Sequence, residues 1–145
     1  MILARAGLER LKLKKHISSI IPIDQIIPAV GQGALGIEIS QKNKFAKEIA
    51  KGIHDNETEN IVKAERAFLK ALGGGCQVPI GAHAELKSNG LYLSGYVGSA
   101  DGKITFTKSI RGKKTEAELI GKELAKDILK AGGKEVLREV YENNG

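Results

Sequence analysis

The single cysteine of the chain, Cys76, lies in a segment that suits it for covalent chemistry. It follows three glycines, Gly73–Gly75, which permit positive φ and let the backbone come close to a bound group. Pro79 restricts the backbone just beyond it. If the glycine N–H groups are left unpaired, they also favour the thiolate, the nucleophilic form of the side chain. A lone cysteine can instead be a small buried hydrophobe, and the loop position argues against that alternative.

A helix is predicted to lead into this segment. Asn56 and Glu59 have the spacing of a capping pair, with Asn56 as the N-cap. Apolar residues then recur at helical spacing up to the glycines, at Ile61, Ala64, Phe68 and Leu72. The cysteine would therefore stand just after the C-terminal end of an amphipathic helix.

Three strands are predicted after the cysteine, at about Gly81–Leu86, Leu91–Val97 and Ile104–Ile110. Ser88-Asn89-Gly90 and Asp101-Gly102 supply the turns between them. In the second strand one face carries Leu91, Leu93, Gly95 and Val97, and the other carries Tyr92, Ser94 and Tyr96.

Two further helices are predicted to close the chain. Thr115 and Glu118 form a second capping box, which opens a helix to Ala131 that Gly132-Gly133 ends. The last helix is Lys134–Tyr141. The order α-β-β-β-α-α predicts an α+β domain, a three-stranded antiparallel sheet with helices on one face.

The first fifty residues give a fragmentary α/β pattern that does not look self-contained. A helix is predicted at Ala6–Leu13, a strand at Ala34–Ile39 and a helix at Lys44–Ile53, with Pro22 and Pro28 breaking regularity. The strand has no sheet neighbours within this stretch, so we expect it to be disordered or to pair across an exposed edge.

Composition excludes several classes of protein. Hydrophobic residues make up 41% and charged residues 28% of the 145 positions, which is typical of a globular chain. No apolar run approaches the ~18 residues of a membrane span, and no secretory h-region is present. One cysteine cannot form an internal disulfide, so we expect a cytoplasmic protein without membrane partners. His16, His54 and His83 are scattered along the sequence, and we expect no metal site.

The formal net charge of +6 is compatible with a solvated lysine-rich surface. It also favours anionic partners, which could be nucleic acid, acidic lipid or a small polycarboxylate. Composition alone does not choose among them.

Several long motifs resemble the porphobilinogen deaminase family, and they occur in the order found there. The segment Gly74–Gly81 is similar to the cofactor-attachment loop of that family, and Ala64–Leu69 is similar to the helix before it. Further stretches that resemble family signatures are Leu3–Leu11, Pro28–Glu38, Val97–Gly102 and Glu135–Tyr141. The likeness spans nearly the whole chain.

The resemblance implies a transferase that joins four porphobilinogen molecules head to tail with loss of ammonia, giving hydroxymethylbilane for heme biosynthesis. It implies that Cys76 holds a dipyrromethane cofactor through a thioether, with Gly75 in the same loop. It also implies that Arg10 binds the carboxylates of cofactor or substrate and that Gln32 lies close to the active-site cleft. Arg66, in the Ala64–Leu69 motif, is expected to make an ion pair.

The family's chains are about twice this length, so the resemblance implies that an N-terminal half is missing. That half carries the catalytic aspartate and most of the pyrrole-binding arginines, and no catalytic residue is expected here. Residues 1–51 would be remnants of two α/β domains related to periplasmic binding proteins: the tail of domain 2 up to Gln32, then a return segment of domain 1. Residues 52–56 would be a hinge and residues 57–145 the cofactor-attachment domain. The expected partners are porphobilinogen, the growing polypyrrole and the missing half.

A basic nucleic-acid-binding module is the alternative. The α-β-β-β-α order also occurs in double-stranded-RNA-binding domains, and Arg111, Lys113 and Lys114 precede a helix. Against it, Glu116 and Glu118 occupy the first turn of that helix, where a phosphate contact needs positive charge. We therefore expect no nucleic-acid partner.

Overall fold

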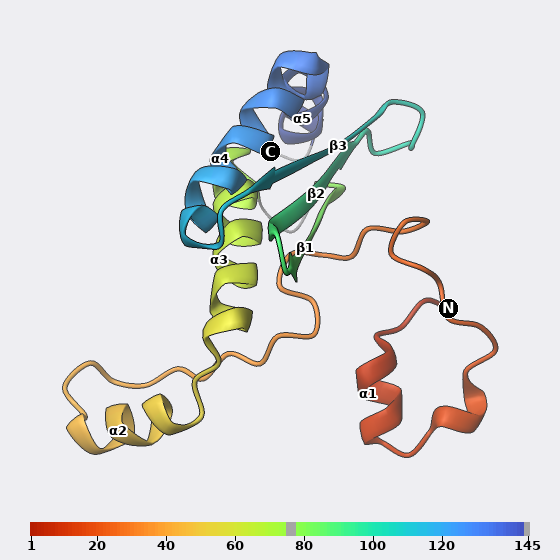
Figure 1. The fold of residues 1–145 in the computed structure, drawn as a ribbon. Coiled ribbons are helices and arrows are strands. Elements are labelled where there is room, and N and C mark those ends of the chain that lie inside the picture. The colour runs from red at the N-terminus through yellow and green to blue at the C-terminus, as the bar shows by residue number, and fades with distance from the viewer. Residues whose placement is uncertain (75–77, 144–145) are drawn as a thin grey trace.

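The computed structural model describes residues 1–74 and 78–143 (Figure 1). Its centre is an antiparallel sheet with the strand order β1-β2-β3. The strands are β1 (Ile80–Lys87), β2 (Gly90–Gly98) and β3 (Thr105–Gly112). The register places Leu93 between Ala84 and Ile110, so apolar side chains of all three strands fall on the same face.

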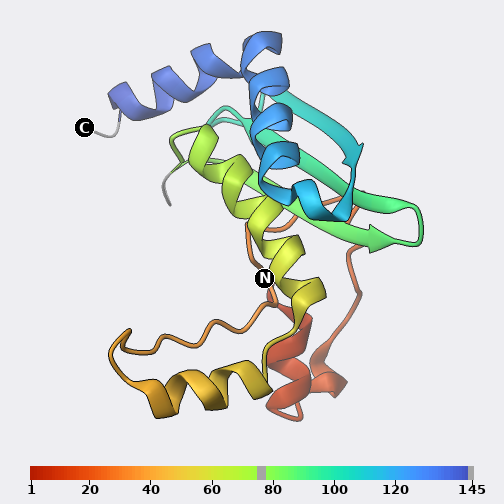
Figure 2. The ribbon, with the colours of Figure 1, turned by 60° about the vertical axis from the view of Figure 1, so that its left-hand side comes forward.

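Helices cover that face of the sheet and leave the other face open (Figures 1 and 2). The covering layer consists of α3 (Asn56–Ala71) and α4 (Ala117–Ile128), while α5 (Lys134–Asn143) follows a glycine turn. The largest fully buried side chains, contributed by both layers, are Phe68, Leu91, Leu93, Val97, Leu124 and Ile128. The predicted α+β architecture is confirmed.

The middle strand β2 shows why the two layers fit closely. Leu91, Leu93 and Val97 are fully buried, as the alternation predicted. Gly95 shares their face, and a Cβ there would lie 2.6 Å from Cζ of Phe68 and 3.0 Å from Cδ2 of Leu124. The missing side chain therefore makes the space that α3 and α4 fill.

The two covering helices also touch at a glycine. A Cβ on Gly121 of α4 would collide with the carbonyl oxygen of Ala64 and lie 2.7 Å from the amide nitrogen of Phe68. Because these are backbone atoms of α3, a side chain at residue 121 could be accommodated only if the helices moved apart.

Each predicted N-cap residue lies one position away from the N-cap of the structure. Helix α3 is capped by Asp55 and not by Asn56: its carboxylate accepts a hydrogen bond from the Thr58 N–H at 2.6 Å. That bond lowers the pKa of Asp55. Adjacent residues can both cap a helix, and the extended backbone of Asp55 (φ −113°, ψ 111°) selects it.

Thr115 does not cap α4, contrary to the predicted capping box. The chain forms a single 3₁₀ turn over Lys114–Glu116, in which the Glu116 N–H donates to the Lys113 carbonyl at 3.0 Å. Thr115 lies inside this turn, and no side-chain cap hydrogen bond is made at the start of α4. At the other end, a wide turn over Leu129–Gly133 ends the helix, with Gly132 at φ 115° as the glycine pair predicted.

The first 55 residues contain little regular structure. They form α1 (Arg5–Arg10), a 3₁₀ turn at Lys14–His16 and α2 (Lys44–Gly52). Both helices lie beyond the N-terminal end of α3 (Figures 1 and 2). Helix α1 stops short of the predicted Leu13, because Lys12 adopts φ 59°.

The strand predicted at Ala34–Ile39 is wrong, because in the described part of the chain that stretch joins no sheet. Alternating residues favour a strand only when a partner strand satisfies the backbone, and the sheet of this structure ends at β1. Leu35 and Ile37 are accordingly 86% and 64% exposed.

None of the helices in residues 1–74 and 78–143 has the length and hydropathy needed to cross a bilayer. Within the same ranges, no three His, Cys, Asp or Glu side chains gather as a potential metal ligand set.

Replacing Gly121 with alanine tests the helix contact. Overpacking should lower the free energy of unfolding by roughly 1–3 kcal/mol, although alanine favours helix by about 1 kcal/mol. Urea denaturation measures the change. Gly7→Ala is the matched control, since nothing lies within 4 Å of a Cβ at that helical glycine. If both variants were equally stable, α3 and α4 would not be in contact at Gly121.

Candidate functional site

A buried carboxylate joins the N-terminal stretch to the sheet domain. Glu65 projects inward from α3 and is only 4% exposed. Its Oε1 accepts a hydrogen bond from the Ala84 N–H of β1 at 2.8 Å, and its Oε2 accepts one from the Gly31 N–H at 2.7 Å. Two backbone donors thereby compensate the loss of water around the charge.

The edge of β1 is covered beside this carboxylate. The Ala82 N–H donates to the Pro28 carbonyl at 3.0 Å. A Cβ on Gly81 would lie 2.9 Å from the Ile27 carbonyl oxygen, so a glycine is needed for the close approach. The outward-facing N–H groups of Ala82 and Ala84 are thus both satisfied by partners outside the sheet.

Gln32 is held in place by this attachment. It sits at the centre of a turn between Gly31 (φ 73°) and Gly33 (φ 88°), and its N–H donates to the Ala29 carbonyl at 3.1 Å. The Glu65 bond to Gly31 fixes one side of that turn. The side chain of Gln32 is exposed and lines a large concavity.

The concavity has a volume of about 830 Å³ and is formed by residues of the first 32 positions. Its lining is largely aliphatic, with isoleucines at positions 2, 17, 20, 21, 23, 26 and 27. Among the lining residues Arg5 is the one arginine. It is bonded to Glu9 at 2.8 Å, which lowers the pKa of the Glu9 carboxyl.

Arg10 does not line this concavity. It is the last residue of α1 and is exposed. Leu8, which does line the cavity, is two residues earlier and hence about 200° away around the helix. Of the two predicted polar site residues, the structure therefore brings Gln32 and not Arg10 to the cavity.

Cys76 and Gly75 lie outside the described residues, so their predicted roles stay predictions. The described chain resumes at Val78, which is buried. The Pro79 carbonyl then accepts a hydrogen bond from the Gly98 N–H of β2 at 2.9 Å. The C-terminal flank of the cysteine segment is thus fixed to the sheet.

The N-terminal flank is also fixed. The Gly74 N–H donates to the Leu69 carbonyl at 3.0 Å, and Gly73 adopts φ 70° after the end of α3. The Tyr141 hydroxyl of α5 donates to the Gly73 carbonyl at 2.6 Å. Helices α3 and α5 therefore position the last described residue before Gly75.

Glu65 is the residue that sequence reasoning missed. It falls in the apolar stripe of α3, at helical spacing between Ile61 and Phe68, and a charge at such a position signals a buried partner. The neighbouring Arg66, which the family motif predicted to make an ion pair, is exposed in the structure.

Comparison with known proteins decides the family. A family model described as the porphobilinogen deaminase dipyromethane cofactor binding domain matches residues 1–75, and one described as the porphobilinogen deaminase C-terminal domain matches residues 60–130. The chain belongs to the porphobilinogen deaminase family. The family resemblance predicted from the motifs is confirmed, and the nucleic-acid alternative receives no support.

Individual relatives agree. The porphobilinogen deaminase of Chlorobium phaeobacteroides (strain BS1) is 46% identical over 144 residues, covering 97% of this chain and 46% of that protein. Those of Chloroherpeton thalassium and Carboxydothermus hydrogenoformans are 45% and 43% identical, over 99% and 97% of this chain and 47% and 45% of theirs. The chain thus spans about half the length of the curated relatives it matches.

Glu65→Gln should lower the free energy of unfolding by about 2 kcal/mol, because the amide –NH₂ would face a backbone N–H that has lost its acceptor. Chemical denaturation measures the loss. Amide exchange should accelerate at Gly31 and Ala84, the two donors. Glu123→Gln, an exposed substitution on α4, is the control and should be near neutral. Unchanged exchange at both amides would contradict the assigned role of Glu65.

Proposed function

We propose that the chain supplies the cofactor-anchoring part of a porphobilinogen deaminase, which joins four porphobilinogen molecules head to tail to give hydroxymethylbilane. The observation that carries the proposal is the match of residues 1–75 to the dipyromethane cofactor binding domain, followed directly by Cys76 in its glycine segment. A single cysteine fits a reducing cytoplasm as the place of action.

Cys76 is the proposed anchor. Its sulfur would bond to the aminomethyl carbon of a pyrrole: one C–S bond forms, one C–N bond breaks, and ammonia leaves with the thiol proton, so no oxidant is needed. A thiolate suits this step because it is a strong nucleophile toward such a carbon. The described flanks, Gly74 bonded to Leu69 and Pro79 bonded to Gly98, would hold the segment between fixed ends.

The polar groups proposed to serve the cofactor are Arg10, Gln32 and the backbone of Gly75. Each pyrrole unit carries an acetate and a propionate, and guanidinium groups bind carboxylates well. Arg10 is exposed, and no ion pair engages it within the described residues. Gln32 presents its amide from a turn that Glu65 holds. Two rings bear four carboxylates, so cations beyond Arg10 are needed, and the part of the family's length that this chain does not span is proposed to supply them beside the cofactor.

The aliphatic concavity is proposed to receive that part. Its lining offers Arg5, already bonded to Glu9, which is too little positive charge for a polycarboxylate. Ile2, Ile20 and Ile23 are 71%, 57% and 47% exposed, and burying such side chains is favourable. On this proposal residues 1–51 complete two domains of the longer enzyme, residues 52–56 form the hinge, and residues 57–145 are the cofactor-attachment domain.

Attachment is tested by intact mass after co-expression with the first half of the Chlorobium phaeobacteroides relative. The chain should carry the added mass of two linked pyrroles, and Cys76→Ser should abolish it. Arg66→Gln, an exposed substitution on α3, should keep the adduct. Cys76 is rejected as the anchor if the C76S chain still carries the adduct. It is also rejected if the wild-type chain carries no adduct although the co-expressed halves are active.

Activity should require both halves. Given porphobilinogen, the purified chain alone should form no bilane, because no general acid/base aspartate has been assigned to it. The co-expressed pair should form it steadily, with the intact relative as positive control. Sustained bilane formation by the chain alone would disprove the proposal that activity needs both halves.

A further inference from the structure

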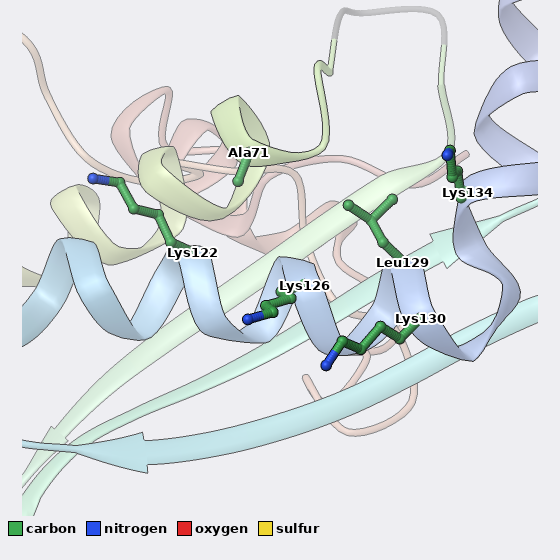
Figure 3. Close-up of a pocket in the computed structure, with 6 residues that line it drawn as sticks. All are labelled: Ala71, Lys122, Lys126, Leu129, Lys130 and Lys134. Carbon is green, nitrogen blue, oxygen red and sulfur yellow. The ribbon is translucent and has the colours of Figure 1, made fainter.

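A row of lysines lies on the far side of α4 from the sheet. Lys122, Lys126 and Lys130 are four residues apart, so they share one side of the helical stretch, and Lys134 follows at the start of α5. All four line a depression of about 320 Å³ together with Ala71 and Leu129. Figure 3 shows the lysine side chains issuing from successive turns, with Leu129 among them and Ala71 facing them from α3.

The charge of this surface is weakly compensated. Lys122 approaches Glu118 at 3.9 Å, and both side chains are more than 60% exposed. Within the described residues no ion pair engages Lys126, Lys130 or Lys134. No acidic residue lines the depression. Like charges four residues apart disfavour a helix, and a bound anion would relieve that repulsion.

We propose that this lysine surface binds an aromatic polycarboxylate, namely carboxylate-bearing pyrrole units. Lys126, Lys130 and Lys134 would contact the carboxylates, and Leu129 with Ala71 would contact the ring. The site is separate from the concavity lined by Gln32 and from the residues proposed to serve the cofactor.

The shape of the surface favours a small aromatic anion over an inorganic anion such as phosphate. An apolar floor, lined by Leu129, Ala71 and the aliphatic stems of lysines that carry charged ends, suits a ligand with an apolar body and several charges. Inorganic phosphate would leave Leu129 without a partner. A nucleic-acid single strand would need aromatic side chains for its bases, and none lines the depression.

The identity of the occupant as a pyrrole unit rests on the proposed function, whereas binding of an aromatic polycarboxylate does not. Ala71, part of the floor, stands five residues before Cys76 in the sequence. Gly73, two residues after Ala71, is bonded to Tyr141 of α5. The surface thus includes the end of α3, the helix that precedes the proposed anchor segment in the chain.

The test uses the C76S chain, so that failure of cofactor attachment cannot affect the result. Mellitate, an aromatic hexacarboxylate, is titrated into the isotope-labelled chain and amide shifts are followed. We expect shifts concentrated over residues 122–134 and weaker binding as salt is added. Replacing Lys126, Lys130 and Lys134 with glutamine should raise Kd about tenfold or more. Ala71→Glu, which places a carboxylate on the floor, should weaken binding comparably.

The control replaces Lys42, Lys47 and Lys108 with glutamine, changing the net charge equally at exposed positions away from α4. It should alter Kd by no more than about threefold. The inference is overturned if the control loses as much affinity, if millimolar mellitate gives no shifts over residues 122–134, if pyrophosphate binds as tightly, or if duplex RNA displaces mellitate.

Discussion

The carboxylate of Glu65 is the group on which the arrangement of this chain depends. A buried charge is tolerated only when hydrogen bonds replace its hydration. Here the Gly31 and Ala84 N–H groups supply them, from stretches 34 and 19 residues away in sequence. The same two bonds place the Gln32 turn beside α3 and seal part of the edge of β1. One buried side chain thus holds the turn that carries a candidate site residue and occupies one donor on the outer edge of β1.

The sheet domain could be predicted because its signals are local. Alternation in β2 gave the buried face, and the spacing of Ile61, Ala64, Phe68 and Leu72 gave the buried side of α3. Asp55 and Asn56 are both suitable N-cap residues, and the predicted N-cap was one residue away from the observed one. The strand expected at Ala34–Ile39 failed for another reason: no strand of the described residues pairs with it, and the outer edge of β1 takes Pro28 and Glu65 as partners.

The candidate site could likewise be predicted only in part. Gln32 was predicted from a motif, and the structure places it on a concavity that no local pattern reveals, because the lining comes from separate stretches of the first 32 residues. The cavity-facing side of α1 carries Leu8 and Arg5, while Arg10 lies elsewhere on the helix. The lysines of α4 have a spacing visible in the sequence, yet only the position of Ala71 and Leu129 shows that they surround a hollow.

The hydroxyl of Tyr141 and the carbonyl of Gly73 are separated by 68 residues, and their bond ties the two ends of the sheet domain together. Because α5 follows the three strands and α4 in the chain, this contact can form only after those elements have been synthesised. Loss of α5 would therefore leave the Gly73 carbonyl without this donor, and the end of α3 would lose its connection to the last described helix.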